Sequence, residues 1–430
     1  MAQALRIAMA GLGTVGAGTV RLLAENADIL SRRCGRALAL TAVSARDRGR
    51  DRGVDISGCR WFDDPVRMAR EADADVIVEL IGGADGPAKA TVEAAIGAKR
   101  HVVTANKALL AMHGATLARA AESAGVTLAF EASVAGGIPI VKALREGLAA
   151  NRISRVYGIL NGTCNYILTT MRATGRAFDD VLAEAQKLGY AEADPSFDVD
   201  GTDAAHKLAV LTALAFGCEP NFAGIHIEGI RHVTPLDIAY AAELGYRIKL
   251  LGHARMTEHG VEQRVHPCMV PLDAPIAHVE GVLNAVVASG NFVGDTVFEG
   301  RGAGAGPTAS AVAADLVDIA LGQSRPVFSV PARELKRVAA APMERHRGEY
   351  YVRLTVLDRP GVIADVAATL RDEKISMAAM IQRGRSPDDI VPVVLMTHET
   401  EESSMARALA RIAALDSSAE PPRMIRIESL

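Results

Sequence analysis

Several residue types and patterns are scarce in this 430-residue chain, and their scarcity excludes whole classes of protein. The five cysteines are scattered along the chain and form no C-x-x-C pair. Their odd number and spacing argue against a disulfide framework or a thiolate zinc site, and favour a reducing, cytoplasmic location. The 11 histidines form no H-E-x-x-H pattern, so we do not expect a zinc enzyme.

Long apolar runs and a large excess of one charge are also lacking. No apolar run is long enough to span a bilayer, and the net charge of −4 creates no field that would attract nucleic acid or an anionic membrane. An apolar stretch follows Arg6, but its glycines fit a strand-to-helix turn better than a signal peptide. We therefore predict no nucleic-acid partner and no membrane partner.

The remaining composition is that of a globular protein with two or three domains. Hydrophobic residues make up 49% of the chain and charged residues 23%, while aromatic residues contribute only 4%. The length allows a sizeable core. Because Ala and Gly are abundant, we expect Ala-rich helices and Gly-rich loops.

The first 130 residues alternate strands with helices. Buried strands are expected at residues 5–10, 38–44, 76–81, 101–104 and 126–130, with Ala-rich helices between them. This alternation predicts an α/β fold, a Rossmann-type doubly wound parallel sheet covered by helices on both faces.

From residue 131 to about 305 the strands become half-exposed, as at 154–160, and the helices lengthen, as at 178–188 and 202–216. This pattern predicts a central α+β domain with an open sheet. Such a sheet needs a partner for its bare face, which favours a dimer. An Ala-rich helix expected at 308–321 indicates that the chain returns to the first domain at about 306–335.

A charged and Ala-rich stretch, residues 336–348, is predicted to be a linker to a compact unit at 349–430. Strands are expected there at 350–357, 375–382, 390–397 and 423–427, and helices at 360–374 and 401–414. The resulting order, β-α-β-β-α-β, is the ferredoxin-like pattern.

The loop after the first strand reads Gly11-Leu12-Gly13-Thr14-Val15-Gly16. In this motif the first glycine permits a tight turn, the second lets the backbone approach a pyrophosphate, and the third allows close helix packing. The helix N-terminus then offers free N–H groups to the phosphates. The loop therefore predicts a dinucleotide site, with a purely structural turn as the alternative.

The end of the second strand bears on the choice between NAD and NADP. An acid is expected there for NAD, but the chain has Arg46 and Arg48 on either side of Asp47. Arginines suit a 2′-phosphate, so we favour NADP over NAD. The alternative is that these arginines belong to a solvated loop.

Two lysines are candidates for proton transfer. Lys107 follows Thr104 at the carboxyl end of the predicted sheet, where ligands bind in such folds. Asp203 and Lys207 are four residues apart at the start of a predicted helix and share a face, which places Lys207 at the edge of the core beside acids. An exposed helix-start lysine and an ordinary surface ion pair are the respective alternatives.

Two Gly-containing segments offer oxygen atoms and amides. Glu131, followed by the irregular stretch to Pro139, could bind a hard cation through its carboxylate and neighbouring carbonyls, or could be an interdomain hinge. The segment 161–166 could bind a polar substrate, or could be a turn with a helix cap.

In their order along nearly the whole chain, these motifs resemble homoserine dehydrogenase. The resemblance rests on the segments 11–16, 104–107, 131–139, 161–166, 189–195, 198–207 and 302–308. The segment from Gly189 to Lys207 is the most specific of them. The final unit resembles an ACT domain, since Asp358-Arg359-Pro360-Gly361 matches the strand-to-helix loop of that amino-acid-sensing module. The chain has no room for an aspartate kinase domain, so the resemblance is to the monofunctional form.

The resemblance implies reversible NAD(P)-dependent conversion of L-aspartate 4-semialdehyde to L-homoserine, on the route to threonine, methionine and isoleucine. It implies proton transfer by Lys207, with Lys107 and Asp203 assisting. The other implied roles are substrate binding by Glu192, Asp198, Gly162, Thr163 and Tyr190, in the domain 131–305; cofactor binding by Gly11, Gly13, Thr14, Val15, Gly16, Arg46, Thr104, Lys107 and Gly304; and a sodium site at Glu131 with the carbonyls of Val134, Gly136 and Ile138.

The ACT resemblance implies an amino-acid effector, expected to be threonine, at Asp358, Pro360 and Gly361, in a homodimer or homotetramer. Two alternatives stay open at this stage. One is another amino-acid dehydrogenase, such as aspartate dehydrogenase, which would not need the 192–207 segment. The other is a non-catalytic amino-acid sensor that has kept the nucleotide fold.

Overall fold

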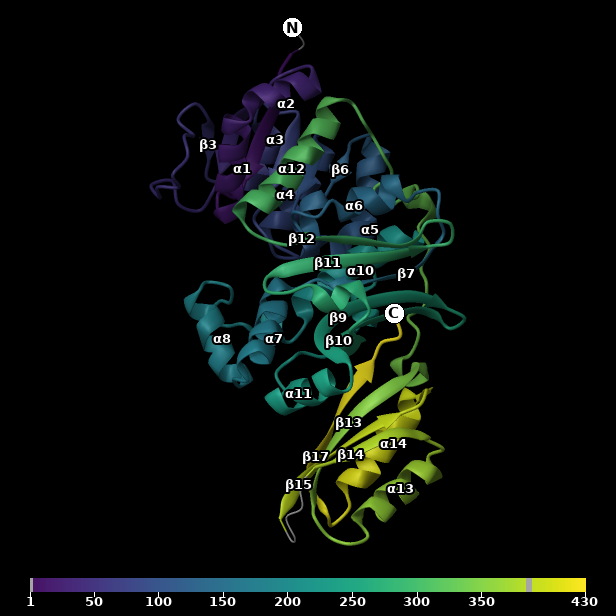
Figure 1. Cartoon of the computed structure of the whole chain (residues 1–430). Coiled ribbons are helices and arrows are strands. Elements are labelled where there is room, and N and C mark those ends of the chain that lie inside the picture. The colour runs from purple at the N-terminus through teal and green to yellow at the C-terminus, as the bar shows by residue number, and fades with distance from the viewer. Residues whose placement is uncertain (1–2, 384–388) are drawn as a thin grey trace.

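A computed structural model describes residues 3–383 and 389–430 of the chain. Figure 1 shows three tiers: an N-terminal domain, a central domain and a C-terminal module, with the C-terminus beside the central tier. Within the described ranges, no helix is both long and apolar enough to cross a membrane.

The N-terminal domain contains a parallel sheet with the strand order β3-β2-β1-β4-β5-β6. Its strands are β1 (Leu5–Ala10), β2 (Leu38–Ser44), β3 (Arg60–Phe62), β4 (Val76–Glu79), β5 (His101–Thr104) and β6 (Leu128–Ala129). Its helices are α1 (Thr14–Glu25), α2 (Ala27–Cys34), α3 (Pro65–Glu71), α4 (Pro87–Gly97) and α5 (Lys107–Ala124). The direction of strand addition reverses between β1 and β4, which opens the ligand-binding crevice of this fold.

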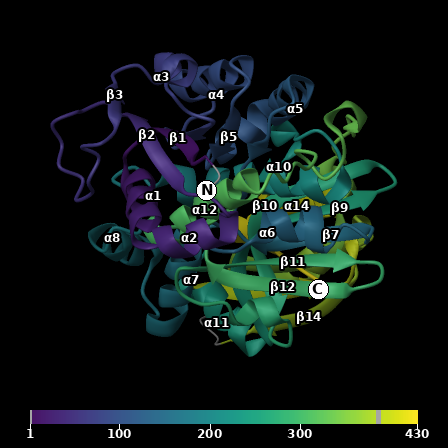
Figure 2. The same cartoon turned by 90° about the horizontal axis from the view of Figure 1, so that it is seen from above.

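A helix from much later in the chain completes this domain. α12 (Ala305–Ala320) packs beside α1, and its buried face joins the apolar cluster that includes Leu5, Ile7 and Met9 of β1. Both views show α12 among the N-terminal helices (Figures 1 and 2). The approach is close because Gly18 lacks a side chain: a Cβ there would lie 2.8 Å from the carbonyl oxygen of Ala305.

The central domain combines a mixed sheet with the helices that carry the candidate active site. Its strands are β7 (Ile153–Ile159), β8 (His226–Ile227), β9 (Tyr246–Thr257), β10 (Gly260–Pro271), β11 (Leu283–Gly290) and β12 (Gly294–Arg301). Its helices are α6 (Ile140–Lys142), α7 (Gly162–Thr174), α8 (Phe178–Lys187), α9 (Ser196–Val199), α10 (Thr202–Phe216) and α11 (Pro235–Glu243). α10 is buried along almost its whole length and packs against β7, β9 and α5.

The C-terminal module has the expected ferredoxin-like order. It consists of β13 (Arg347–Leu357), α13 (Val362–Asp372), β14 (Met377–Gln382), β15 (Ile390–Thr397), the two-residue β16 (Thr400–Glu401), α14 (Glu402–Ala413) and β17 (Ser418–Ile427). β17 is longer than the strand expected at 423–427, because it continues through Pro421 and Pro422 with register shifts against β13.

The module is not separate from the central sheet. β17 pairs in parallel with β10, so the strand order β12-β11-β7-β9-β10-β17-β13-β15-β14 runs through both parts. Three short segments share the outer edge of β10: residues 339–341 at Val261, β8 at Arg264 and Val265, and β17 at Cys268 and Met269. The segment 336–348, expected as a linker, is therefore hydrogen-bonded to the central domain in its first half.

Candidate active site

A cleft of about 880 Å³ lies over the glycine loop and the ends of β2 and β4. Gly11 has φ 103°, and a Cβ there would lie 2.5 Å from the carbonyl oxygen of Leu80. A Cβ on Gly16 would lie 2.1 Å from the carbonyl oxygen of Gly11, whereas the space beside Gly13 is open. Gly11 and Gly16 therefore shape the loop, and Gly13 leaves room for a ligand to approach the backbone.

The helix that follows this loop begins within the glycine motif. α1 starts at Thr14 with Gly13 as its N-cap, so the amides of Thr14 and Val15 lie in its first turn. These N–H groups have no intrahelical acceptor and suit a phosphate. Arg46, Arg50 and Arg52 also line this cleft.

Glu79, at the end of β4, has a structural role that the sequence motifs do not predict. It is fully buried and accepts hydrogen bonds from the amides of Ile81 (2.7 Å) and Gly82 (3.1 Å). Thr104 Oγ1 donates to its other oxygen at 2.6 Å. Thr104 thus supports the loop after β4, which lines the cofactor cleft, through Glu79. A carboxylate ending a buried apolar strand was the available signal.

A second cavity of about 590 Å³ lies between the N-terminal and central domains. Most of the residues predicted to act on substrate or nicotinamide line it. They are Val15, Lys107, Gly162, Thr163, Tyr190, Glu192, Asp198, Asp203, Lys207 and Gly304. Residues separated by up to nearly 300 positions in the sequence therefore face one space.

Asp203 lies between the two lysines at the base of this cavity. Lys207 Nζ is 2.7 Å from Asp203 Oδ2, and Lys107 Nζ is 3.1 Å from Asp203 Oδ1. Lys207 Nζ also donates to the carbonyl oxygen of Leu160 at 2.7 Å. Gly201, the N-cap of α10 with φ 90°, starts the helix so that Asp203 and Lys207 fall one turn apart on the cavity side.

The two lysines differ in exposure. The side chain of Lys107 is 30% exposed, whereas that of Lys207 is only 10% exposed. The Lys107 ammonium also lies 5.8 Å from the centroid of the Phe197 ring, within the range of a cation–π contact. Lys107 therefore stands between solvent and the buried Asp203–Lys207 pair.

The two acids of this cluster have opposite pKa shifts. Burial would raise the pKa of Asp203, but the charges of Lys207 and Lys107 outweigh it and hold that pKa well below its usual range. Burial raises the pKa of Asp198, and the neighbouring charge of Asp203 raises it further. Asp203 is thus a fixed anion, while Asp198 is closer to protonation.

Asn161 joins these acids, although the sequence predicts only a polar loop at 161–166. Its Nδ2 donates to both Asp198 Oδ1 and Asp203 Oδ2, each at 2.8 Å. Its Oδ1 accepts the amide of Cys164 and so caps α7. Asn161 therefore fixes the acids relative to the helix that bears Gly162 and Thr163.

Tyr190 and Glu192 belong to the loop between α8 and α9. Thr163 Oγ1 donates to the carbonyl oxygen of Tyr190 at 2.7 Å, and the Tyr190 ring lies edge-on to Tyr166, with centroids 4.9 Å apart. Gln186 Nε2 donates to the carbonyl oxygen of Glu192 at 3.0 Å. These contacts hold the exposed Glu192 side chain on the wall of the cavity.

The predicted cation site borders the same cavity through Ser133 and Ala135. Glu131 is buried, and its carboxylate accepts the amides of Val141 (3.0 Å) and Lys142 (2.8 Å). Burial, together with the nearby Asp315, raises its pKa to about 7. Burial also raises the pKa of Asp315 to about 6. Two neighbouring carboxyl groups are thus buried here, and Val134, Gly136 and Ile138 follow Glu131 closely in the chain.

The predicted effector loop joins β13 to α13. Gly361 is the N-cap of α13 with φ 97°, and Gln382 Nε2 lies 3.4 Å from Asp358 Oδ1. Pro360 and Gly361 are exposed, so the loop is open to an external ligand.

Comparison with known proteins adds an independent line of support. Family models described as "Homoserine dehydrogenase, NAD binding domain", "Homoserine dehydrogenase" and "ACT domain" match residues 11–131, 139–317 and 350–417. The homoserine dehydrogenase of Neisseria gonorrhoeae is 46% identical over 432 residues, covering 99% of each chain. A solved homoserine dehydrogenase from Thiobacillus denitrificans has a TM-score of 0.92 at 46% identity, covering 99% of this chain and 98% of that one. A hyperthermophilic archaeal homoserine dehydrogenase in complex with NADPH has a TM-score of 0.65 at 27% identity, covering 75% of this chain and 99% of that one.

Proposed function

The chain belongs to the homoserine dehydrogenase family, and on that premise we propose that it interconverts L-aspartate 4-semialdehyde and L-homoserine. Membership makes the protein an NAD(P)-dependent oxidoreductase that acts on a CH–OH group, with an ACT domain at its C-terminal end. The family and the fold class predicted from the sequence are thereby confirmed. The observation that carries the proposed chemistry is the Asp203 carboxylate, which lies between two lysines at the wall of a cavity.

Reduction of an aldehyde adds a hydride to carbon and a proton to oxygen. Bound NAD(P)H supplies the hydride. Lys207 donates a proton from its ammonium group to the carbonyl oxygen, and Asp203 keeps that ammonium in place. Lys107, on the other oxygen of Asp203, connects the pair to solvent and restores the proton. In the oxidation of homoserine, neutral Lys207 accepts the hydroxyl proton.

The remaining cavity residues match an amino-acid substrate. The carboxylate of Glu192 binds the substrate ammonium, and Asp198 lies where it assists in orienting the substrate. Gly162 and Thr163, at the start of α7, offer backbone amides and a hydroxyl, and the half-exposed Tyr190 closes the same wall. Gly304, the N-cap of α12, also lines the cavity and is assigned to the cofactor.

For the cofactor we propose NADP in preference to NAD. Arg46, Arg50 and Arg52 on the cleft wall favour a 2′-phosphate, and an archaeal relative has been solved with NADPH. We expect Arg46→Ala to raise KM for NADP by about 10–100-fold, since hydrogen bonds to charged groups contribute roughly 1.5–3 kcal/mol, with little change in KM for NAD. Arg48→Ala is the matched control, because Arg48 is the arginine of this loop that lies over Trp61 without lining the cleft. Equal increases in KM for NADP and for NAD would contradict the assignment of Arg46 to the 2′-phosphate.

A sodium ion at Glu131 and the carbonyls of Val134, Gly136 and Ile138 is also proposed. The fit rests on two neighbouring buried carboxyl groups with raised pKa values, and on Ser133 Oγ, a buried oxygen without a hydrogen-bond partner. A small cation held by oxygen atoms would favour the ionised form of Glu131 and brace the backbone along the cavity.

We further propose feedback control by threonine, bound at Asp358, Pro360 and Gly361, in a cytoplasmic homodimer or homotetramer of threonine, methionine and isoleucine biosynthesis. The exposed loop at the start of α13 supports an effector site there. Control of this kind requires two states that bind the effector differently.

One experiment tests these proposals together. Purified enzyme is assayed for oxidation of homoserine with NAD and NADP in parallel, with and without threonine, and aspartate is tested as a competing substrate. We expect turnover with homoserine, a higher kcat/KM with NADP, and inhibition by threonine. Oxidation of aspartate without homoserine turnover would contradict the proposed reaction, and indifference to threonine would contradict the proposed effector.

A further inference from the structure

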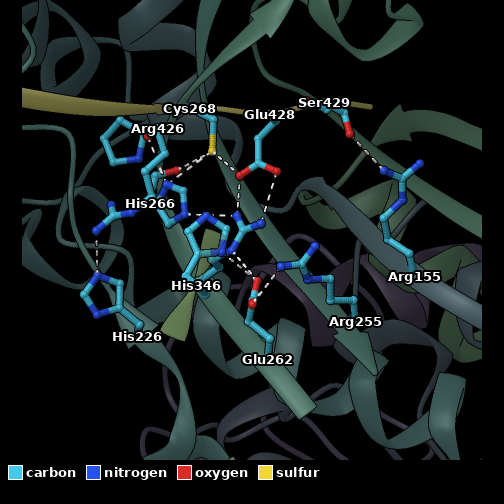
Figure 3. Close-up of polar contacts among 12 residues, drawn as sticks. Arg155, His226, Arg255, Glu262, His266, Cys268, His346, Arg426, Glu428 and Ser429 are labelled. Carbon is cyan, nitrogen blue, oxygen red and sulfur yellow. Dashed lines mark hydrogen bonds and ion pairs between the residues drawn. The ribbon is translucent and has the colours of Figure 1, made fainter. Parts of the chain in front are cut away.

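The seam between β10 and β17 contains a dense group of buried charges (Figure 3). Arg426 of β17 is only 2% exposed. Within the ACT module it donates through Nε to Glu402 Oε2 at 3.0 Å, and Nη2 contacts the other oxygen of Glu402. Tyr350 Oη donates to the same carboxylate at 2.9 Å. Arg426 is therefore fixed to the module by β17 itself and by the first turn of α14.

The same guanidinium reaches into the central domain. Its Nη1 and Nη2 donate to Glu228 Oε2 and Oε1 at 3.0 and 2.9 Å, which makes a bidentate pair. His226 Nε2 lies 2.7 Å from Glu228 Oε1. Burial would raise the pKa of Glu228, but the hydrogen bonds from His226 and Arg426 hold it well below its usual range. Glu228 is thus a fixed anion clamped by the C-terminal module.

The segment that follows Glu228 leads to the catalytic helix. The Glu228 amide donates to Val265 of β10, and the Ile230 amide donates to the carbonyl oxygen of Val199 at 2.9 Å. A Cβ on Gly229 would lie only 2.3 Å from that Val199 oxygen, so the two segments are in close backbone contact. Val199 ends α9, and Gly201, two residues on, begins α10.

Gly201 is itself in contact with this region. A Cβ there would lie 3.0 Å from Ile227 and 3.4 Å from the carbonyl oxygen of Glu228. Arg231 adds a further link, with its Nε 2.6 Å from Asp200 Oδ1. The residues at 227–231 therefore hold the start of α10, two residues before Asp203 and six before Lys207.

We propose that the bidentate Arg426–Glu228 pair transmits the state of the ACT module to the N-terminal end of α10 and so sets the placement of Asp203 and Lys207. Arg426 and Glu228 are positioning residues that act through 229–230 and 199–201. The predicted effector loop follows β13, and β13 pairs with β17 opposite Arg426 at Tyr350, which completes the route. The inference rests on the proposed function, because it assigns a regulatory path to that active site.

A metal site is the other chemistry that this seam suggests. His266, Cys268 and Glu428 are buried, with ligand atoms within 4.8 Å of one another. However, Arg264 Nη2 donates to Glu428 Oε2, and Arg264 Nη1 lies beside His266 Nε2, both at 3.2 Å. Binding a cation would require this buried guanidinium to leave, so the arrangement favours a fixed ion-pair network.

The test compares two carboxylates that both pair with arginines of the module. Glu228→Gln keeps the shape of the side chain and removes its charge. Glu243→Gln is the matched control, because Glu243 at the end of α11 pairs with Arg383 at the surface. Both variants are measured as full-length chains for thermal stability, for hydrogen exchange in the peptide spanning 198–210, and for kcat and KM with homoserine and NADP.

For Glu228→Gln we expect faster exchange in that peptide and a fall in kcat of about tenfold, towards the lower end of the range for coupled sites. KM for NADP should stay within about twofold, since the cofactor cleft is untouched. Arg426→Lys keeps the positive charge but cannot form the bidentate pair with Glu228, so it should lower kcat by a similar factor. The double variant Glu228→Gln/Arg426→Lys should lower kcat little further than either single variant.

The outcomes separate the inference from the proposed function. Wild-type enzyme without homoserine turnover would overturn the reaction, while the exchange measurement would still decide the coupling. Exchange and kcat equal to those of Glu243→Gln would overturn the coupling. Faster exchange with unchanged kcat in an active enzyme would overturn the claim that the pair sets the placement of the catalytic residues.

Discussion

Two buried charge clusters in this enzyme have opposite compositions. At the candidate active site one carboxylate, Asp203, is shared by two lysines. At the seam each arginine is shared by two carboxylates: Arg426 by Glu228 and Glu402, and Arg264 by Glu262 and Glu428. The first cluster borders a cavity, whereas Arg264 and Arg426 are each 2% exposed.

The difference matters because lysine and arginine differ as acids. A lysine ammonium can release its proton within the range that enzymes reach, whereas an arginine guanidinium stays charged. A carboxylate between two lysines, one of them open to solvent, therefore suits proton movement. A guanidinium between two carboxylates forms a permanent link. The active site uses the first arrangement, and the joint between domains uses the second.

Removing the buried lysine of the active site should have the largest effect. We expect Lys207→Met to lower kcat by about 10³-fold, because general acid–base catalysis contributes roughly 10²–10⁴-fold. Steady-state oxidation of homoserine measures this, and NADPH fluorescence checks that cofactor binding is kept.

The matched control is another buried lysine outside the site. Burial lowers the pKa of Lys249 to about 8, and its Nζ donates to Asn165 and Val279. Lys249→Met should keep kcat within about threefold of wild type, since general acid–base catalysis is assigned to Lys207. If both variants lose activity equally, burial of a lysine rather than its place beside Asp203 explains the loss.

Asp203→Asn tests the shared carboxylate. We expect kcat to fall by about 10²-fold, at the lower end of the acid–base range. The folded-state pKa of Asp203 is lowered, so its contribution to stability is present above its unfolded pKa of about 3.9 and is lost as pH falls through the lower folded value. Urea unfolding should therefore show a difference from wild type that shrinks below about pH 4. A stability difference between Asp203→Asn and wild type that grows as pH falls would contradict the negative charge assigned to Asp203.

For Arg264, the seam arginine that pairs with Glu262 and Glu428 and not with Glu228, stability rather than turnover should respond. Arg264→Met leaves two buried carboxylates without their guanidinium, which we expect to lower the free energy of unfolding by about 3–5 kcal/mol. Denaturant unfolding measures the loss, and kcat of the folded fraction should be retained. Adding Glu428→Gln should recover part of the stability. If Arg264→Met lost kcat but kept normal stability, Arg264 would serve turnover and not the structure, which would contradict the contrast between the two clusters.

The cation proposed at Glu131 should give the smallest effect. The folded pKa of this carboxyl group is raised from 4.5 to about 7, so the stability it contributes is present below 4.5 and is lost as pH rises through 7. Sodium, by binding the ionised form, should raise Tm by about 2–4 °C at pH 8 when present at roughly tenfold its Kd, and by less at pH 5. Choline chloride is the salt control. Glu131→Gln should remove the dependence, and a sodium effect that persists in this variant would place the ion elsewhere.

Local patterns predict the elements that have one buried face or clear end signals. α10 occupies residues 202–216 as predicted, since Gly201 and Gly217 bound it in left-handed conformations. The hairpin of β9 and β10 is not predicted, because β10 is buried at ten consecutive positions and shows no alternation. These strands also contain His253, Arg264 and His266, which are buried here although polar and charged residues are usually exposed, so the sequence does not indicate buried strands.

The sequence predicts those residues of the candidate site that lie in recognisable local motifs. The positions of Asp203, Lys207 and Lys107 follow from spacing and strand order, and the structure brings them into one cavity. Asn161 bonds to Asp203 across 42 residues, and Arg426 to Glu228 across 198. No local pattern encodes such pairings, so the support of the acids and the joint to the ACT module emerge only from the folded chain. The catalytic and binding roles assigned from the resemblance stay predictions.

The pairing of β10 with β17 also orders events during synthesis. Arg264 and Glu428 are 164 residues apart, so at 5–20 residues per second the ribosome makes the second partner roughly 8–33 s after the first. Throughout that interval β17 is absent from the outer edge of β10. The hydrogen-bonding groups of Cys268 and Met269 on that edge are then open to other nascent chains. Lys107, Asp203 and Lys207, the proposed catalytic residues, are all translated before this edge is closed. Co-translational folding of the enzyme is therefore completed by its ACT module.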